Sequence, residues 1–290
     1  LHAEEENYAS IEGDTTRYLF AAEAIAAAQA GDTIQIHGTV KWGYDAESWP
    51  DGGLTVAGVG ENASLVLNGA YASESRKTYL GCDMTFNNLT MELKNDMNYI
   101  FACGHRLEIG EDVVIKGNGT IDSGSIGSAH LTVVGGSDIE EVDHTELILH
   151  AGTYDYIIGG GLTQDVAGNT DIYVGSEAKG SPVIIGGGYR GNVGGDVSAE
   201  INMGSAERVI GGGYKGHVEG STDIFVNSRV PLGGVIGGCW LGHVTGNTSL
   251  VLGENSSVTF SSIYGGSIVN SLGWLVDDGL LYDPVRLDTD

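Results

Sequence analysis

Short segments in which apolar and polar residues alternate recur along the second half of the chain. Four of these segments align with one another, at residues 170–174, 197–201, 222–226 and 248–252. Alternation with a period of two predicts a β-strand that buries one face. The first half contains shorter segments of the same kind, at residues 54–56, 64–67, 84–86, 89–91, 107–109 and 113–115.

A glycine-rich motif repeats with the same period. The sequence Ile-Gly-Gly-Gly occurs at residues 158–161, 185–188 and 210–213, and altered copies stand at 236–239 and 264–267. The first glycines of the copies are 27, 25, 26 and 28 residues apart. A β-propeller blade needs about 40–50 residues, so this period is too short for one. We therefore predict a parallel β-solenoid in which each repeat forms one coil and coils stack about 4.8 Å apart.

The N-terminal part predicts a cap followed by irregular coils. Residues 14–30 form an alanine-rich amphipathic segment that predicts a helix. The segments AGDTIQIHGTV (30–40) and GLTVAGVGENASLVLNG (53–69) follow it. This order resembles the start of the right-handed parallel β-helices of the pectin lyase-like superfamily. The resemblance implies an all-β fold with right-handed winding and an N-terminal capping α-helix that protects the first strand edge. No catalytic motif of that superfamily is matched.

These patterns predict a single β-helix domain over residues 1–290. We expect the cap helix at 14–30, irregular coils at 31–150 and regular coils of about 26 residues at 151–272. The segment 273–290 departs from the repeat. It is either a C-terminal cap over the last coil, which its apolar residues favour, or a linker toward a further domain.

Composition limits the partners that the protein can have. Lys and Arg total 13 against 39 Asp and Glu, a formal net charge of -26. Such a charge argues against binding nucleic acid through its phosphates. The chain contains no run of about 20 apolar residues, so we expect no membrane insertion. The three cysteines are expected to be free thiols rather than a disulfide set. Acidity and repeats favour a secreted or cell-surface bacterial protein, extracellular or attached to the cell wall.

Acidic residues occupy outward positions on the regular strands. The alignment places Asp171, Glu200 and Asp223 on successive coils, each offset by two residues from the next, which gives backbone separations of about 8 Å. Inverting glycosidases hold two carboxyl groups about 6.5–9.5 Å apart. The three acids are therefore candidate catalytic residues, and the flanking Tyr173 and Phe225 are candidates for stacking on sugar faces. The alternative is a solvated strand face that keeps the repeats soluble.

Two further groups are candidates for glycan binding. The loop at 41–51 carries Trp42, Tyr44 and Trp49, which either shape a binding face or pack beneath the cap. His217 and His243 stand at equivalent positions of neighbouring coils, and form either a ligand site or surface decoration. Two imidazoles are too few for a metal site, so we predict no metal and no cofactor.

Aromatic residues also align along the repeats. The position after the glycine motif holds Leu162, Tyr189, Tyr214 and Trp240. Rings stacked on the surface would form a platform for sugars, whereas rings inside would form a core ladder. The leucine in the same column favours the interior ladder.

Two functional hypotheses follow. The first is a non-catalytic surface module that binds carbohydrate or another cell-surface ligand, or serves as an adhesin, as a monomer or part of a larger chain. The even repeats favour it, because a catalytic site should interrupt their regularity. The second is a glycan-active enzyme, either a hydrolase with the carboxylate pair or, less in keeping with the charge, a polysaccharide lyase.

Overall fold

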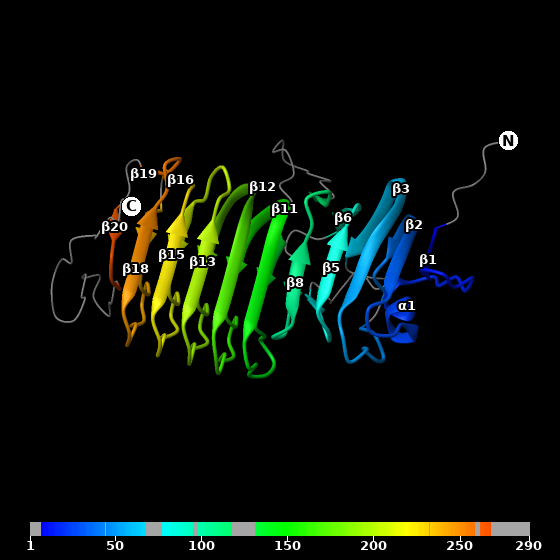
Figure 1. Ribbon diagram of the computed structural model, residues 1–290, viewed down its shortest axis with the longest axis horizontal. Coiled ribbons are helices and arrows are strands. Elements are labelled where there is room, and N and C mark those ends of the chain that lie inside the picture. The colour runs from blue at the N-terminus through cyan, green and yellow to red at the C-terminus, as the bar shows by residue number, and fades with distance from the viewer. Residues whose placement is uncertain are drawn as a thin grey trace.

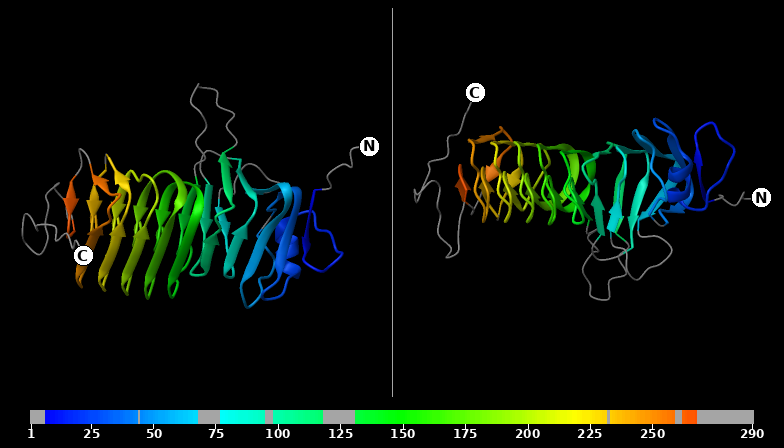
Figure 2. Two further views of the ribbon diagram at one scale, coloured as in Figure 1. Left: turned by 45° about the horizontal axis from the view of Figure 1, so that its top comes forward. Right: turned by 90° about the horizontal axis from the view of Figure 1, so that it is seen from below.

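The described part of the chain winds into a parallel β-solenoid of about eight turns with one short helix near its N-terminal end, as predicted (Figure 1). The computed structural model describes residues 7–43, 45–67, 77–94, 98–117, 131–231, 233–258 and 262–267. Figure 2 shows from two further sides that the coils stack along one axis. Residues one repeat apart in the sequence therefore lie side by side on neighbouring coils.

Three ladders of parallel strands run along the solenoid, named here ladders A, B and C. Ladder A contains β2 (Thr33–Lys41), β3 (Leu54–Leu67), β5 (Met84–Asn87), β8 (Arg106–Ile109), β11 (Thr145–Ile158), β12 (Thr170–Ile185), β13 (Val197–Ile201), β15 (Thr222–Val226) and β18 (Thr248–Leu252). Ladder B contains β4 (Lys77–Tyr79), β7 (Asn98–Phe101), β10 (Leu131–Val134), β14 (Arg208–Ile210), β17 (Val235–Ile236), β20 (Ile263–Tyr264) and the C-terminal ends of β11 and β12. Ladder C contains β6 (Thr90–Leu93), β9 (Val114–Gly117), β16 (Arg229–Val230), β19 (Ser257–Val258) and parts of β2, β3, β11 and β12. It is less continuous than the other two, because β16 and β19 form a separate two-stranded sheet.

The observed register confirms the predicted columns. Ala199 pairs with Ile172 on one side and with Ile224 on the other, and Ile224 pairs with Leu250. All four side chains are buried, and they belong to one continuous apolar core inside the coils. Each coil thus completes the core and the backbone hydrogen bonds of its neighbours.

The N-terminal cap differs from the prediction for residues 14–30. The helix α1 spans only Ala21–Ala27, and the strand β1 (Tyr8–Ile11) precedes it. β1 pairs antiparallel with β2, and backbone hydrogen bonds join Ala9 to Tyr18, which keeps the residues before the helix extended. The Glu23 carboxylate accepts the backbone N–H groups of Leu19 and Phe20 and so fixes the start of the helix. The cap therefore covers the first edge with a strand as well as a helix.

The triple glycines form corners where successive coils touch. A Cβ placed on Gly186 would lie 2.1 Å from the carbonyl oxygen of Gly211 on the next coil. The backbone N–H of Gly186 donates to the carbonyl of Ile210 across the same contact, at 2.8 Å. These corners leave no room for a side chain, which explains why the motif repeats.

Candidate functional site

The outer surface of ladder B carries a column of tyrosine and threonine side chains. Parallel pairing places Tyr99 of β7 beside Thr132 of β10, and Thr132 beside Tyr156 of β11. The next residue of each strand is buried in the core, so these three side chains point outward. Tyr156 is 40% exposed, which leaves much of its ring available to a ligand.

The adjacent outward column of ladder B is apolar and covered. Six of its residues are at most 1% exposed and form a second apolar cluster outside the main core: Phe101, Val134, Ile158, Ile185, Ile210 and Ile236. The chain that follows each glycine motif folds over this cluster. The aromatic column of Tyr189, Tyr214 and Trp240 is half-buried and packs against this second apolar cluster.

The rings of this aromatic column stack on one another. The backbone N–H of Tyr189 donates to the carbonyl of Gly161, and that of Tyr214 to the carbonyl of Gly188, so equivalent residues align from coil to coil. The ring centroids of Tyr189 and Tyr214 are 4.9 Å apart with planes 10° apart, and Trp240 follows at 6.2 Å and 14°. The guanidinium carbon of Arg208 lies 4.4 Å from the Trp240 ring centroid.

The location of these rings corrects the favoured interior arrangement. Tyr189, Tyr214 and Trp240 are half-buried on the outside of ladder B, whereas a core ladder would be enclosed by the coils. The apolar side chain of Leu162 fits this surface position because it too packs on the second cluster.

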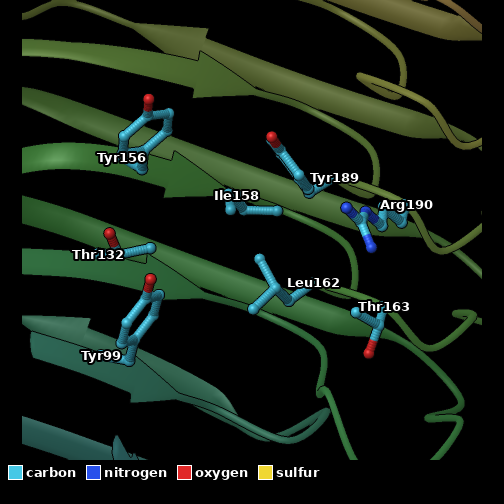
Figure 3. A pocket seen from close by; sticks show the side chains of 8 residues that line it. All are labelled: Tyr99, Thr132, Tyr156, Ile158, Leu162, Thr163, Tyr189 and Arg190. Atoms are coloured by element: carbon cyan, nitrogen blue, oxygen red, sulfur yellow. The ribbon is translucent and has the colours of Figure 1, made fainter. Parts of the chain in front are cut away.

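A pocket opens at the end of the ring stack. Its volume is about 380 Å³, within the range of small-molecule sites. Figure 3 shows Tyr99 and Tyr156 on one side and Tyr189 and Arg190 on the other, with Ile158 between them. Thr132, Leu162 and Thr163 complete the lining. Three aromatic rings, an apolar floor and a few hydrogen-bonding groups therefore converge on one cavity.

Arg190 lines the pocket, and Lys215 lies one coil beyond it. Arg190 and Lys215 are exposed at equivalent positions of successive coils. Within the described part of the chain, neither side chain forms an ion pair. Burial raises the pKa of the Tyr156 hydroxyl, so this group remains a protonated hydrogen-bond donor at neutral pH.

An ion pair stands beside the pocket on the preceding coils. Lys77 of β4 donates to the carboxylate of Asp138, which also accepts the Tyr79 hydroxyl at 3.0 Å. The hydrogen bond to Asp138 raises the pKa of the Lys77 amine, which keeps it charged. Asp138 occupies the position of the aromatic column one coil before Leu162.

The predicted carboxylates lie on ladder A, away from this pocket. Asp171 pairs with Ser198 and Asp223 also pairs with Ser198, while Glu200 stands two residues farther along the same strand. The offset of one coil and two residues is therefore as expected. Burial raises the pKa of Asp171. Glu200 accepts a hydrogen bond from the Asn202 side-chain amide at 2.8 Å.

The two aromatic residues predicted beside these acids are half-buried on ladder A. Tyr173 pairs with Glu200, and Glu200 pairs with Phe225, so all three form one outward column. The Tyr173 ring is tilted against His150, with centroids 5.5 Å apart. His150 in turn lies 3.4 Å from the Glu108 carboxylate. Ladder A thus presents an ionic strip with single aromatic rings rather than a ring stack.

The paired histidines take part in a column of turn hydrogen bonds. The side chain of Asp165 accepts the backbone N–H of Asn192, Asn192 accepts that of His217, and His217 Nδ1 accepts that of His243. The two imidazole rings lie 4.0 Å apart. Burial, followed by the charge of His243, lowers the pKa of His217. A structural hydrogen bond therefore already occupies the Nδ1 acceptor of His217.

The tryptophans of the 41–51 loop pack inward. Trp42 is 3% exposed, and its ring centroid lies 6.5 Å from those of both Trp49 and Phe86. Trp49 is partly buried and covers Gly81, where a Cβ would lie 2.4 Å from the indole. This placement agrees with packing near the cap rather than with a binding face. Tyr44 lies outside the described residues, as does the segment 273–290.

The repeat pattern did not indicate Tyr99, Thr132 and Tyr156 as site residues. Tyr99 and Thr132 lie in the irregular coils, where only the alternation within 98–101 and 131–134 could have located them. Tyr156 stands two residues before Ile158 of the first glycine motif, so the repeat itself could have located it. In the described ranges, no group of three or more His, Cys, Asp or Glu residues is placed to hold a metal ion. No helix in the part of the chain that the structure describes is long and apolar enough to cross a membrane.

Comparison with known proteins adds no relative to this picture. Neither the protein-family models, nor the curated proteins, nor the solved structures gave a match to the chain. The geometry of the solenoid and its surfaces is therefore the basis for assigning a function.

Proposed function

We propose that this protein is a carbohydrate-binding β-solenoid module, and that the pocket on ladder B is its binding site. The observation that carries the proposal is the convergence of Tyr99, Tyr156 and Tyr189 on one cavity with an apolar floor. Aromatic faces pack against the C–H bonds of sugar rings, while hydroxyl and guanidinium groups bond their oxygens. Thr132 and Arg190 supply such groups here.

The wider setting is part of the same proposal. The protein is displayed outside a bacterial cell, secreted or attached to the cell wall, as a monomer or as one module of a longer chain. Its acidity and its rigid repeats support this setting. The proposal also includes right-handed winding and kinship with the pectin lyase-like superfamily. Both rest on the resemblance of the N-terminal helix and the strands after it to the start of the β-helices in that superfamily.

Calorimetric titration with four hexasaccharides, built from β-1,4-linked glucose, xylose, N-acetylglucosamine or mannose, tests the proposal. We expect at least one to bind, and Tyr189→Ala to weaken that binding at least tenfold. Tyr173→Ala is the matched control, because it removes a half-buried outward tyrosine from ladder A. Binding that is lost in Tyr173→Ala and kept in Tyr189→Ala would move the site to ladder A. No binding by any of the four sugars would refute the proposal.

A glycoside hydrolase remains the second candidate, because the register sets Asp171 and Glu200 at an offset compatible with an acid–base pair. The raised pKa of Asp171 suits a general acid. Release of reducing ends from the same hexasaccharides measures this activity. We would assign the enzyme only if release occurs and is abolished in both Asp171→Asn and Glu200→Gln. Turnover that survives these changes would exclude this pair.

A further inference from the structure

The aromatic column ends at Tyr189, and the pocket lies beside this last ring. The backbone N–H of Leu162 donates to the carbonyl of Ser137, as that of Tyr189 donates to Gly161 one coil later. Leu162 therefore occupies the position at which the next two coils carry Tyr189 and Tyr214. One face of the Tyr189 ring stacks on Tyr214, and on its other side the column presents a leucine.

The distance between neighbouring positions of the aromatic column would allow a further ring to stack on Tyr189. Tyr189 and Tyr214 are 4.9 Å apart, close to the separation of about 4.8 Å between neighbouring strands. A ring at position 162 would stand at a similar distance from Tyr189, within the 4.5–7 Å range of stacked rings. The leucine side chain is shorter than a tyrosine and leaves this space to the cavity, above the buried Ile158 (Figure 3).

We infer that a pyranose ring of the ligand takes the place of the missing side-chain ring and stacks on Tyr189, and that Leu162 determines specificity by keeping this slot open. The inference rests on the proposed function and adds the chemical class of the bound residue. A pyranose with equatorial substituents fits, because its axial C–H bonds form a flat apolar face. Its hydroxyl and ring oxygens then accept hydrogen bonds from Arg190, which is exposed beside Tyr189.

Replacing Leu162 with an aromatic residue that fills the slot tests the inference. Leu162→Tyr should extend the ring stack by one member and leave no space for the sugar. The probes are the glucose and xylose hexasaccharides, and calorimetry should show at least a 20-fold loss of affinity with a melting temperature equal to or above that of the wild type. Leu162→Ala keeps the slot open and should bind within fivefold of the wild type. Leu241→Tyr adds a tyrosine beside Trp240, away from the slot, and should bind normally.

Each outcome decides the question. Unchanged affinity in Leu162→Tyr overturns the inference, and so does an equal loss of affinity in Leu162→Ala. If Leu162→Tyr does not fold, Leu162→Phe replaces it. Failure of both variants to fold overturns the inference, because position 162 then offers no space for a ring. Loss of binding in Tyr189→Ala together with normal binding in Leu162→Tyr would refute the inference about position 162 and leave the proposed binding site standing. Normal binding in both variants would remove the proposed site as well.

Discussion

Adding a single methyl group at a corner of the solenoid tests whether close contact between coils holds the fold together. In Gly186→Ala the new Cβ would lie 2.1 Å from the carbonyl oxygen of Gly211 and 2.7 Å from a methyl of Val197. Neither neighbour is the free end of a flexible side chain, so the backbone of one coil has to move. That movement stretches the 2.8 Å hydrogen bond from the Gly186 N–H to Ile210.

The expected loss of stability follows from these two contacts. Overpacking of a close-packed interior costs about 1–3 kcal/mol. A weakened backbone hydrogen bond adds about 0.5–1.5 kcal/mol. We therefore expect Gly186→Ala to lower the free energy of unfolding by about 3 kcal/mol. With a urea m-value of about 2 kcal/mol/M, the midpoint falls by about 1.5 M.

Urea unfolding followed by circular dichroism measures this shift. Gly204→Ala is the matched control, because a Cβ at Gly204 meets no atom within 4 Å and its backbone does not have a positive φ. Alanine there restricts the unfolded chain and should raise stability by up to about 1 kcal/mol. Equal midpoints for Gly186→Ala and the wild type, or a larger drop for Gly204→Ala, would refute the reasoning about coil contact.

Three further predictions concern the histidine column, the core and the pocket rim. Burial lowers the pKa of His217, so the contribution of this group to stability is complete above the unfolded-state pKa of about 6.5 and is lost as the pH falls. The urea midpoint should therefore drop less between pH 7.5 and 5 in His217→Asn than in the wild type, and an equal drop would contradict this. Trp42→Ala should cost about 3–5 kcal/mol in urea unfolding and leave sugar affinity unchanged, so a selective loss of affinity would place Trp42 in a binding site. Arg190→Gln should weaken sugar binding about fivefold in calorimetry, about 1 kcal/mol, with no change in the unfolding midpoint; unaltered affinity would remove Arg190 from the site.

The regular coils could be predicted from sequence because each strand repeats the same physical constraint. The alternation in residues 170–174 and 222–226 sets which side chains enter the core, and stacking of coils turns that into columns. The cap was predicted less well. The alanines of residues 14–30 all lie at position 21 or later, and only that part has a high helix propensity. The hydrogen bonds between Ala9 and Tyr18 hold the residues before it extended. This pairing comes from β1, which lies outside the segment and leaves no signal within it.

The candidate site was predicted only in part. The aromatic column was visible because the glycine motif aligns Tyr189 with Tyr214, yet sequence favoured the interior for it. A second apolar cluster on the outer surface of ladder B reverses that interpretation, and an apolar residue such as Ile158 looks the same in sequence whichever surface it covers. Tyr99 lies in the irregular coils, so its register required the strand pairing itself. Tyr156 lies two residues before the first glycine motif, so its register could have been read from the repeat.

In a solenoid, binding specificity arises most readily where a repeated column changes its residue. A uniform column satisfies its own contacts, as Tyr189 and Tyr214 do by stacking on each other, and has little unsatisfied surface for a ligand. A shorter residue in the same column exposes one ring face while the coils above and below hold that ring rigidly in place. The protein then loses little conformational entropy on binding, because the site is already ordered. In the described coils, the change from Tyr189 to Leu162 creates such a site. The half-buried ring of Tyr189 on one side and the apolar floor at Ile158 are fixed by the fold before any ligand binds.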